Sequence, residues 1–333
     1  MRPRVHISVI LATLVALAAA WLVWWQSIAS TMKEQLTAWT VEAKALGWTI
    51  GTGEVAIDGF PFLLRMRLAA PAVGDGAGRL WRGPPLSVTL RPWAPERASL
   101  TMPGQHLLSA GGEPLVLQMG TAKVDLVLGG HGLEALAADF GDLTAGGAHL
   151  GRAELSLNRL AFAPVTFSTP SLSLSLTLRD LLPAAEPPPP MGRRLVVAAV
   201  KARLLGWLPA AAPKVSVEAW RRDGGTVEVD GLTVEWPPLR LSGKGTLALD
   251  RDLQPLWAGS CSIRGLGEAI DALTGQGLVR AKDGALAKLV LGLLSRPAAD
   301  GVAELTAPVS VEDRMLHIGP AALFKLPELT WPW

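Results

Sequence analysis

Few residues in this 333-residue sequence have the types and spacing that catalysis or metal binding requires. No two histidines have metal-ligand spacing, and neither H-E-x-x-H nor C-x-x-C occurs. The one cysteine excludes an intrachain disulfide and a cysteine-rich metal site. We therefore predict no catalytic residue, no metal and no cofactor. The histidines and the cysteine considered for such roles are His6, His106, His131, His149, His317 and Cys261.

Three short motifs resemble catalytic or phosphate-binding signatures. Ser30 and Lys33 form S-x-x-K, but the companion S-D-N and K-T-G motifs are missing. The segment 242–246, SGKGT, lacks the earlier glycine of a phosphate loop and falls within a strand pattern, and 129–132, GGHG, has no G-x-G-x-x-G frame. We interpret them as interface, strand and turn residues. An enzyme whose site is assembled from distant residues remains an alternative.

A long apolar stretch near the N-terminus indicates where the protein works. The 19 residues from Ile7 to Trp25 carry no charge, and as a helix they would extend about 28 Å. This length matches the roughly 30 Å hydrocarbon core of a bilayer. Indoles favour the membrane–water boundary, and three tryptophans end the stretch. We predict a transmembrane anchor with representative residues Ile7, Leu14, Trp21, Trp24 and Trp25.

A cleaved secretory signal is the competing interpretation of this stretch. Signal peptides usually have an apolar region of about 7–15 residues that ends in a small-residue cleavage site. Here the run is longer and ends in bulky tryptophans, which favours an uncleaved anchor. Arg2 and Arg4 precede the span, whereas Lys33 and Glu34 after it cancel, so we expect a cytoplasmic N-terminus and a body on the other side of the membrane.

The sequence after the anchor changes from helical to strand periodicity. Residues 27–47 read as a juxtamembrane helix with an apolar stripe at Leu36, Trp39, Ala43 and Leu46. From Trp48 onward apolar residues alternate with polar ones, most strictly in SLSLSLTL at 171–178. This period of two predicts antiparallel sheets with one buried and one wet face. The fold class is therefore mostly β (α+β): a transmembrane helix, then antiparallel sheets in two lobes with a few short helices.

A proline-rich segment suggests the domain boundary. EPPPP at 186–190 cannot form a helix or a β-ladder, because proline lacks the amide donor. We predict five parts, with short helices near 267–273 and 281–294 in the last. They are an N-terminal tip and anchor at 1–26, the helix at 27–47, a first β-rich lobe at 48–185, a linker at 186–194 and a second β-rich lobe at 195–333.

A short internal match raises the possibility of two related lobes. Residues 53–59 and 225–231 both fit G-x-V-x-[IV]-D-G, and each copy precedes alternating apolar residues. If the lobes are related, the two segments must occupy equivalent positions in their sheets.

Several strand and turn motifs carry a resemblance to a known family. D-G-F-P-F follows the anchor, W-R-x-x-G-G and W-P-P-L-x-L-x-G-x-G-T-L-x-L-D lie in the second half, and I-G-P comes near the end. The chain resembles single-span bacterial envelope proteins, common in alphaproteobacteria, that are grouped as a domain of unknown function. The motif positions, expected at turns, are Asp58, Gly59, Phe60, Pro61, Phe62, Gly225, Asp230, Gly231, Gly245, Asp250, Gly319 and Pro320.

The resemblance implies a fold and a location, a single-pass anchor in a bacterial inner membrane with a periplasmic body, without implying an activity. A more distant architectural similarity links the chain to AsmA-like and TamB-like proteins, in which an anchor precedes a long β-rich periplasmic body and which are implicated in lipid movement. Fold-level similarity alone does not establish function.

Composition narrows the possible partners. A net charge of +2 with 18% charged residues argues against nucleic acid, and 49% hydrophobic residues allow extensive apolar surface. We expect a non-enzymatic, membrane-anchored periplasmic protein that binds lipid or another apolar envelope component. The alternative is a scaffolding protein that binds envelope proteins through its sheets. Membrane lipids and a lipid ligand are the expected partners; protein partners are unknown.

Overall fold

The computed structural model describes residues 3–110, 112–161, 166–209, 213–297 and 303–331. The chain folds into two compact units, Met1–Gly132 and Leu133–Trp333. Antiparallel β-structure dominates both units, which confirms the predicted fold class.

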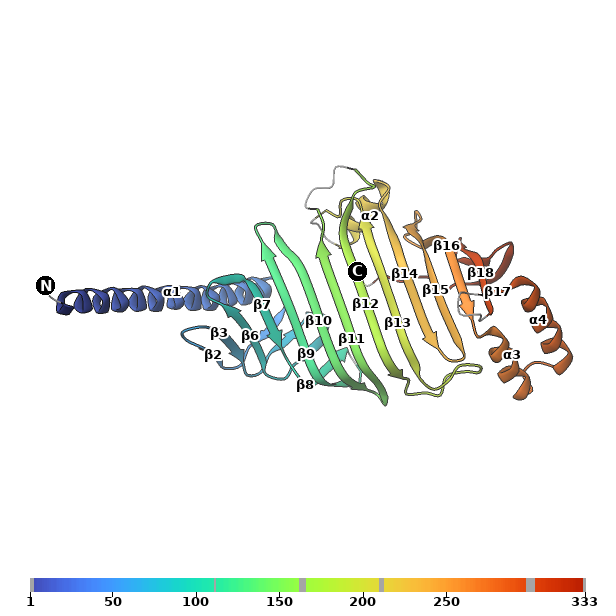
Figure 1. Cartoon of the computed structure of the whole chain (residues 1–333), viewed down its shortest axis with the longest axis horizontal. Helices are drawn as coiled ribbons and strands as arrows, with labels where there is room; N and C mark the ends of the chain where they lie inside the picture. The colour runs from blue at the N-terminus through green and yellow to red at the C-terminus, as the bar shows by residue number, and fades with distance from the viewer. Residues whose placement is uncertain (1–2, 111, 162–165, 210–212, 298–302, 332–333) are drawn as a thin grey trace. The chain divides into compact units, whose positions relative to one another are not determined.

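A single helix opens the first unit. α1 runs without interruption from Pro3 to Ala45, so the predicted anchor and juxtamembrane helix are one element. Its residues 11–45 form the described helix that is long and apolar enough to cross a membrane, with a mean hydropathy of 1.6 in its most apolar window. The first half of α1 projects away from the strands of its own unit, and the second half runs beside them (Figure 1).

The buried face of α1 differs from the predicted stripe. Leu36 is half-buried and Ala43 is buried, but Trp39 and Leu46 are 51% and 73% exposed. The covered positions continue backward at helical spacing through Met32 and residues 21, 25, 28 and 29. The stripe is rotated because the helix packs along its length instead of only at its C-terminal end.

The strands of the first unit form two wings joined by one long strand. β9 pairs with β7 through residues 123–127 and with β8 through residues 115–119. The β7 wing continues through β6 and β3 to β2, and the β8 wing through β5 and β4 to β1. The strands are β1 (Thr49–Gly51), β2 (Val55–Asp58), β3 (Leu64–Leu68), β4 (Ala72–Gly74), β5 (Arg79–Arg82), β6 (Leu86–Arg91), β7 (Ala94–Thr101), β8 (Gly104–Ala110) and β9 (Leu115–Gly129).

The second unit is an antiparallel meander. β10 to β16 pair in chain order, β16 then pairs with β18, and β19 and β20 follow; β17 also pairs with β18. Figure 1 shows β10 to β16 side by side in this order. The strands are β10 (Gly132–Ala145), β11 (Ala148–Arg159), β12 (Pro170–Leu182), β13 (Leu195–Leu205), β14 (Thr226–Trp236), β15 (Leu239–Leu249), β16 (Pro255–Arg264), β17 (Arg296–Pro297), β18 (Ala303–Glu312), β19 (Met315–Ile318) and β20 (Ala321–Lys325).

Three helices lie at opposite ends of these strands. α2 (Pro213–Arg222) connects β13 to β14, and its buried Trp220 donates an indole N–H to the Leu205 carbonyl oxygen at 2.7 Å. α3 (Leu266–Gly275) and α4 (Ala281–Leu294) follow β16 and agree with the predicted helices. Leu286 and Leu289 of α4 are more than 60% exposed, so this side of the helix does not face a core.

The proline-rich segment does not separate two lobes. Residues 186–190 connect β12 to β13, which pair along most of their length in one sheet. The compact units divide instead at Gly132. A run of prolines prevents a ladder locally, but it does not prevent the flanking strands from pairing with each other.

The two G-x-V-x-[IV]-D-G segments lie in different environments. The first supplies β2, a four-residue strand that pairs with β3 and ends in a turn. The second lies in β14, an eleven-residue strand paired on both sides, where its Asp-Gly dipeptide falls inside the strand. The positions are not equivalent, so the hypothesis of two related lobes is wrong.

The contribution of the buried core to the stability of the first unit can be tested. Leu64 on β3 is fully buried, and truncation of such a leucine costs about 2–5 kcal/mol. We expect Leu64→Ala to accelerate hydrogen exchange of the β3 and β6 amides by at least tenfold, measured by mass spectrometry on the full chain. Leu115→Ala, at a site 46% exposed, is the control and should leave exchange nearly unchanged.

Candidate functional site

The strand registers of the second unit place apolar side chains on one face of the sheet. In the middle of the meander, Leu176 of β12 lies opposite Leu155 of β11 and Val200 of β13. The same alignment holds in the neighbouring strands, and we call this surface the apolar face. Its members are Leu136, Ala138, Phe140, Ala153, Leu155, Leu157, Leu172, Leu174, Leu176, Leu178, Ala198, Val200, Ala202, Leu204, Val227, Val229, Leu232, Val234, Leu241, Gly243, Gly245, Leu247, Trp257, Gly259, Cys261, Ile263, Leu305, Ala307, Val309 and Val311.

A β-bulge keeps β14 in phase with this face. Val229 pairs with Gly245 and Leu232 pairs with Gly243, so two residues of β14, Asp230 and Gly231, lie opposite the single residue Lys244 of β15. Without the bulge, Leu232 and Val234 would point to the opposite face, because side chains alternate with a period of two. The Asp-Gly motif was expected at a turn; it is a bulge within a strand instead.

Small residues give the apolar face a flat floor near its C-terminal side. Gly245 of β15 lies opposite Gly259 of β16. A Cβ atom on either glycine would come within 2.9 Å of the Trp257 ring, so the indole lies directly over both glycines. The pair thus provides room for an aromatic ring that stays close to the sheet.

The apolar face is open rather than covered by a second layer. Among the described residues of the face, only the small Ala138 and Ala202 and the valine Val311 are less than 9% exposed. Its longer side chains are half-buried, and Leu174 is 38% exposed. In a two-layered sheet, central leucines of this kind would be fully buried.

The opposite face of the same sheet is polar and rich in ion pairs. Arg203 of β13 donates to both carboxylate oxygens of Asp230 at 2.9 and 2.6 Å and lies 2.9 Å from the Glu228 carboxylate. Its hydrogen bonds lower the pKa of Asp230. Arg264 similarly donates to Glu304 at 2.6 Å and lowers the pKa of that carboxyl group. The sheet therefore separates a charged surface from an apolar one.

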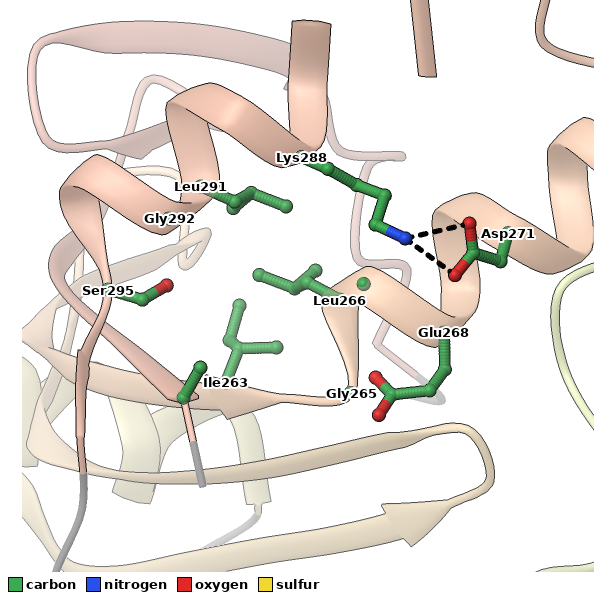
Figure 2. Close-up of a pocket in the computed structure, with 11 residues that line it drawn as sticks. Ile263, Gly265, Leu266, Glu268, Asp271, Lys288, Leu291, Gly292 and Ser295 are labelled. Atoms are coloured by element: carbon green, nitrogen blue, oxygen red, sulfur yellow. Dashed lines mark hydrogen bonds and ion pairs between the residues drawn. The ribbon is translucent and has the colours of Figure 1, made fainter. Parts of the chain in front are cut away.

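A cavity of about 360 Å³ opens where the apolar face meets α3 and α4. Ile263 of β16, Leu266 of α3 and Leu291 of α4 point toward one another around it (Figure 2). At the rim, Lys288 donates to both carboxylate oxygens of Asp271 at 3.0 and 2.8 Å. The cavity continues the apolar face and ends in charged groups.

The histidines considered as possible functional residues either have structural roles or lie apart from one another. The buried His106 uses both ring nitrogens: Nδ1 accepts from the Trp81 indole at 3.2 Å, and Nε2 lies 3.1 Å from the Met102 carbonyl oxygen. His149 is 4.0 Å from an exposed Asp142 carboxylate, and His131 and His317 lie elsewhere in the chain. Among the described residues, no three of His, Cys, Asp and Glu gather as metal ligands.

The short motifs also have structural explanations. The Ser30 hydroxyl donates to the carbonyl oxygens of Gln26 and Ser27 within α1. The SGKGT segment lies inside β15, as predicted. Burial raises the pKa of the Cys261 thiol, which keeps it protonated on the apolar face.

The family-motif residues occupy three kinds of position. Asp58 to Phe62 form the end of β2 and the turn after it, Asp250 accepts backbone N–H bonds from Asp252 and Gln254 in the turn after β15, and Gly319 and Pro320 form the turn between β19 and β20. Gly225 precedes β14, where the Trp220 ring leaves no space for a Cβ atom. Gly245 lies within β15, and the bulge residues Asp230 and Gly231 lie within β14.

The anchor residues belong to α1, and three of them contact turns between the strands of the first unit. The indoles of Trp21, Trp24 and Trp25 donate to backbone carbonyl oxygens of residues 61, 92 and 63. Leu14 is 58% exposed, and the backbone of Ile7 is helical. The sequence did not indicate these hydrogen bonds, because tryptophan near a bilayer boundary has a sufficient explanation in the boundary itself.

Fold and surface together define a class: a protein with an N-terminal helix that can cross a membrane and a body of open antiparallel sheet. The chain belongs to a family described as uncharacterised protein conserved in bacteria (DUF2125), whose model matches residues 25–327. This match confirms the predicted family resemblance. No curated protein and no solved structure matches the chain.

The glycine pair under Trp257 provides a test of the close packing between β15 and β16. A Cβ atom at Gly259 would lie 2.3 Å from the Lys244 carbonyl oxygen, so β15 and β16 must separate to accommodate it. We expect Gly259→Ala to destabilise these strands by about 2 kcal/mol, which corresponds to roughly 30-fold faster amide exchange.

Gly231→Ala is the matched control for this test. A Cβ atom at Gly231 meets no other atom within 4 Å. Exchange should stay within about threefold of the unmodified chain, as expected for a position where an added methyl group meets open space. Equal effects of both substitutions would show that the close packing at Gly259 has no special importance.

Proposed function

We propose that this protein binds the acyl chains of a lipid on the apolar face while α1 anchors it in a bacterial inner membrane. The supporting observation is the continuity of that face across eight strands, β10 to β16 and β18. Strands about 4.8 Å apart give a surface roughly 34 Å wide. One layer of acyl chains occupies half of the roughly 30 Å bilayer core, or about 15 Å. The apolar face is therefore wide enough to hold an acyl chain along its whole length.

The chemistry of the face suits a hydrocarbon ligand. Its members include no charged residue, and their side chains offer only the Trp257 indole and the Cys261 thiol as polar groups. Arg159, which pairs with Leu172 at the end of β11, places one guanidinium group at the edge of the face, where it donates to the Leu133 carbonyl oxygen at 3.0 Å. Protein interfaces usually form about one hydrogen bond per 100–200 Å² of area. A surface with almost no donor or acceptor matches an acyl chain, because an acyl chain forms no hydrogen bonds.

An apolar surface of this extent also needs an occupant in water. Soluble proteins rarely expose apolar patches larger than a few hundred Å², and larger patches mark interaction sites. The cavity beside α3 and α4 offers a place for the polar end of such a ligand, since Lys288, Asp271 and Glu268 lie at its rim. The proposed activity is therefore binding without catalysis.

The charges around α1 support the proposed placement in the cell. Arg2 and Arg4 precede the apolar stretch and favour a cytoplasmic N-terminus, so the β-structured body is proposed to be periplasmic. In this position the body would lie next to a source of lipid. A scaffolding role, in which another envelope protein covers the apolar face, is the competing proposal.

Site-specific crosslinking distinguishes lipid from protein on this face. A photoreactive benzoylphenylalanine replaces Leu174, whose side chain lies on the apolar face, in the full chain expressed in bacteria. After irradiation we expect lipid adducts, identified by mass spectrometry of the purified chain. The matched control replaces Ser175, the next residue on the same strand, which faces the polar side and should yield several-fold less lipid adduct.

The nature of the adduct decides the question. Protein adducts at residue 174 without lipid adducts would support the scaffolding role and contradict lipid binding. Equal lipid labelling at residues 174 and 175 would show that the contact is not specific to the apolar face.

A further inference from the structure

The β2–β3 and β6–β7 turns of the first unit present exposed aromatic side chains next to α1. Phe60 and Phe62 are 51% and 67% exposed, and Trp93 is 55% exposed. We call these three residues the aromatic collar. Large aromatic side chains at the tips of turns are unusual in a protein surrounded only by water.

The collar lies at the level where the apolar stretch of α1 ends. The Trp93 ring stacks on Trp21 with ring centroids 6.3 Å apart, and the Phe60 ring packs edge-on against Trp25 at 5.7 Å. Both tryptophans belong to the group that ends the uncharged stretch at residues 7–25. Each collar turn is therefore attached to the part of the helix that would emerge from the bilayer.

Hydrogen bonds from indole side chains to backbone carbonyl oxygens fix the two turns to the helix. The Trp21 indole donates to the Pro61 carbonyl oxygen at 2.9 Å, and the Trp25 indole donates to that of Leu63 at 2.8 Å. The Trp24 indole donates to the Pro92 carbonyl oxygen at 3.3 Å. Because all three donors belong to one helical segment, the depth of the helix sets the depth of the collar.

The β2–β3 turn is also rigid by itself. The Leu63 amide donates to the Gly59 carbonyl oxygen at 2.9 Å, and Gly59 has a φ of 106°, a conformation that glycine adopts without strain. A Cβ atom at Gly59 would lie 2.7 Å from the Leu63 carbonyl oxygen. Phe62, whose side chain is 67% exposed, lies within this hydrogen-bonded turn.

We propose that the aromatic collar inserts into the headgroup region of the bilayer that α1 crosses, as a second membrane contact of the first unit. Aromatic rings favour this region, where one part of the ring meets hydrocarbon and another meets water. The exposed cation Arg91 beside the β6–β7 turn suits contact with lipid phosphates. The inference depends on the membrane anchor but is independent of lipid binding by the second unit.

Lipid-borne quenching measures this insertion directly. With Cys261 replaced by serine, single cysteines at residues 62 and 93 carry a polarity-sensitive fluorophore in the full chain, reconstituted in phosphatidylcholine and phosphatidylglycerol vesicles. We expect nitroxide groups on the lipids to quench both labels several-fold more than labels at the control positions, and aqueous iodide to quench them less.

Two exposed positions of the same unit serve as controls. Trp39 on α1 is 51% exposed, close to the exposure of Trp93, but lies 14 residues or about 21 Å beyond Trp25. Ala77 is exposed in the turn between β4 and β5, near the far end of α1. Labels at both positions should respond to iodide and only weakly to lipid nitroxides.

A label at residue 14 separates failure of the collar from failure of the anchor. Strong lipid quenching at residue 14 without quenching at residues 62 and 93 would overturn the collar and leave the anchor intact. Absence of lipid quenching at all three positions would overturn both. Shielding of residue 62 from lipid and iodide alike would indicate a protein partner and would also overturn the proposal.

Discussion

The alternation of side chains across a pleated strand is the constraint on which the second unit depends. Each of its strands can hold an apolar row on one side only if the pairing register is correct, because a shift by one residue reverses every side chain. The chain satisfies this condition across eight strands and corrects the phase of β14 with a bulge. Because that bulge carries Asp230, the same device also supplies an ion-pair partner for Arg203 on the opposite face.

An open sheet of this kind gains little stability from burial beneath a second layer. Most of its residues are half-buried, so cross-strand contacts and ladder hydrogen bonds contribute more than burial beneath a second layer. Removal of apolar area from water is the dominant favourable term in folding, and a ligand on the apolar face would add to it. Binding and folding are therefore thermodynamically linked in this unit, since whatever covers the face stabilises the folded sheet.

The sequence predicted the elements of this fold better than their arrangement. Strict alternation at 171–178 predicted β12 and its two-sided character, and the spacing in 281–294 predicted α4. The proline run was misread because local backbone chemistry says nothing about whether flanking strands pair. The apolar face itself depends on register between strands far apart in sequence, which no single segment of the chain contains.

The functional residues divide in the same way. The candidate span could be read from the sequence, because it needed only length and hydropathy. The indole hydrogen bonds of α1 could not, because their acceptors are backbone carbonyl oxygens that every residue carries. Asp230 and Gly231 did carry a signal: the apolar period in β14 shifts by one residue across them, as a bulge requires.

The continuity of α1 has a mechanical consequence. The helix passes from its apolar half to its strand-packed half without a break, and three indole hydrogen bonds attach the turns near its midpoint. Helices adapt to bilayers of different thickness by tilting. With no hinge between the two halves, a change in tilt would turn the attached strands by the same angle, so bilayer thickness would set the inclination of the first unit above the membrane.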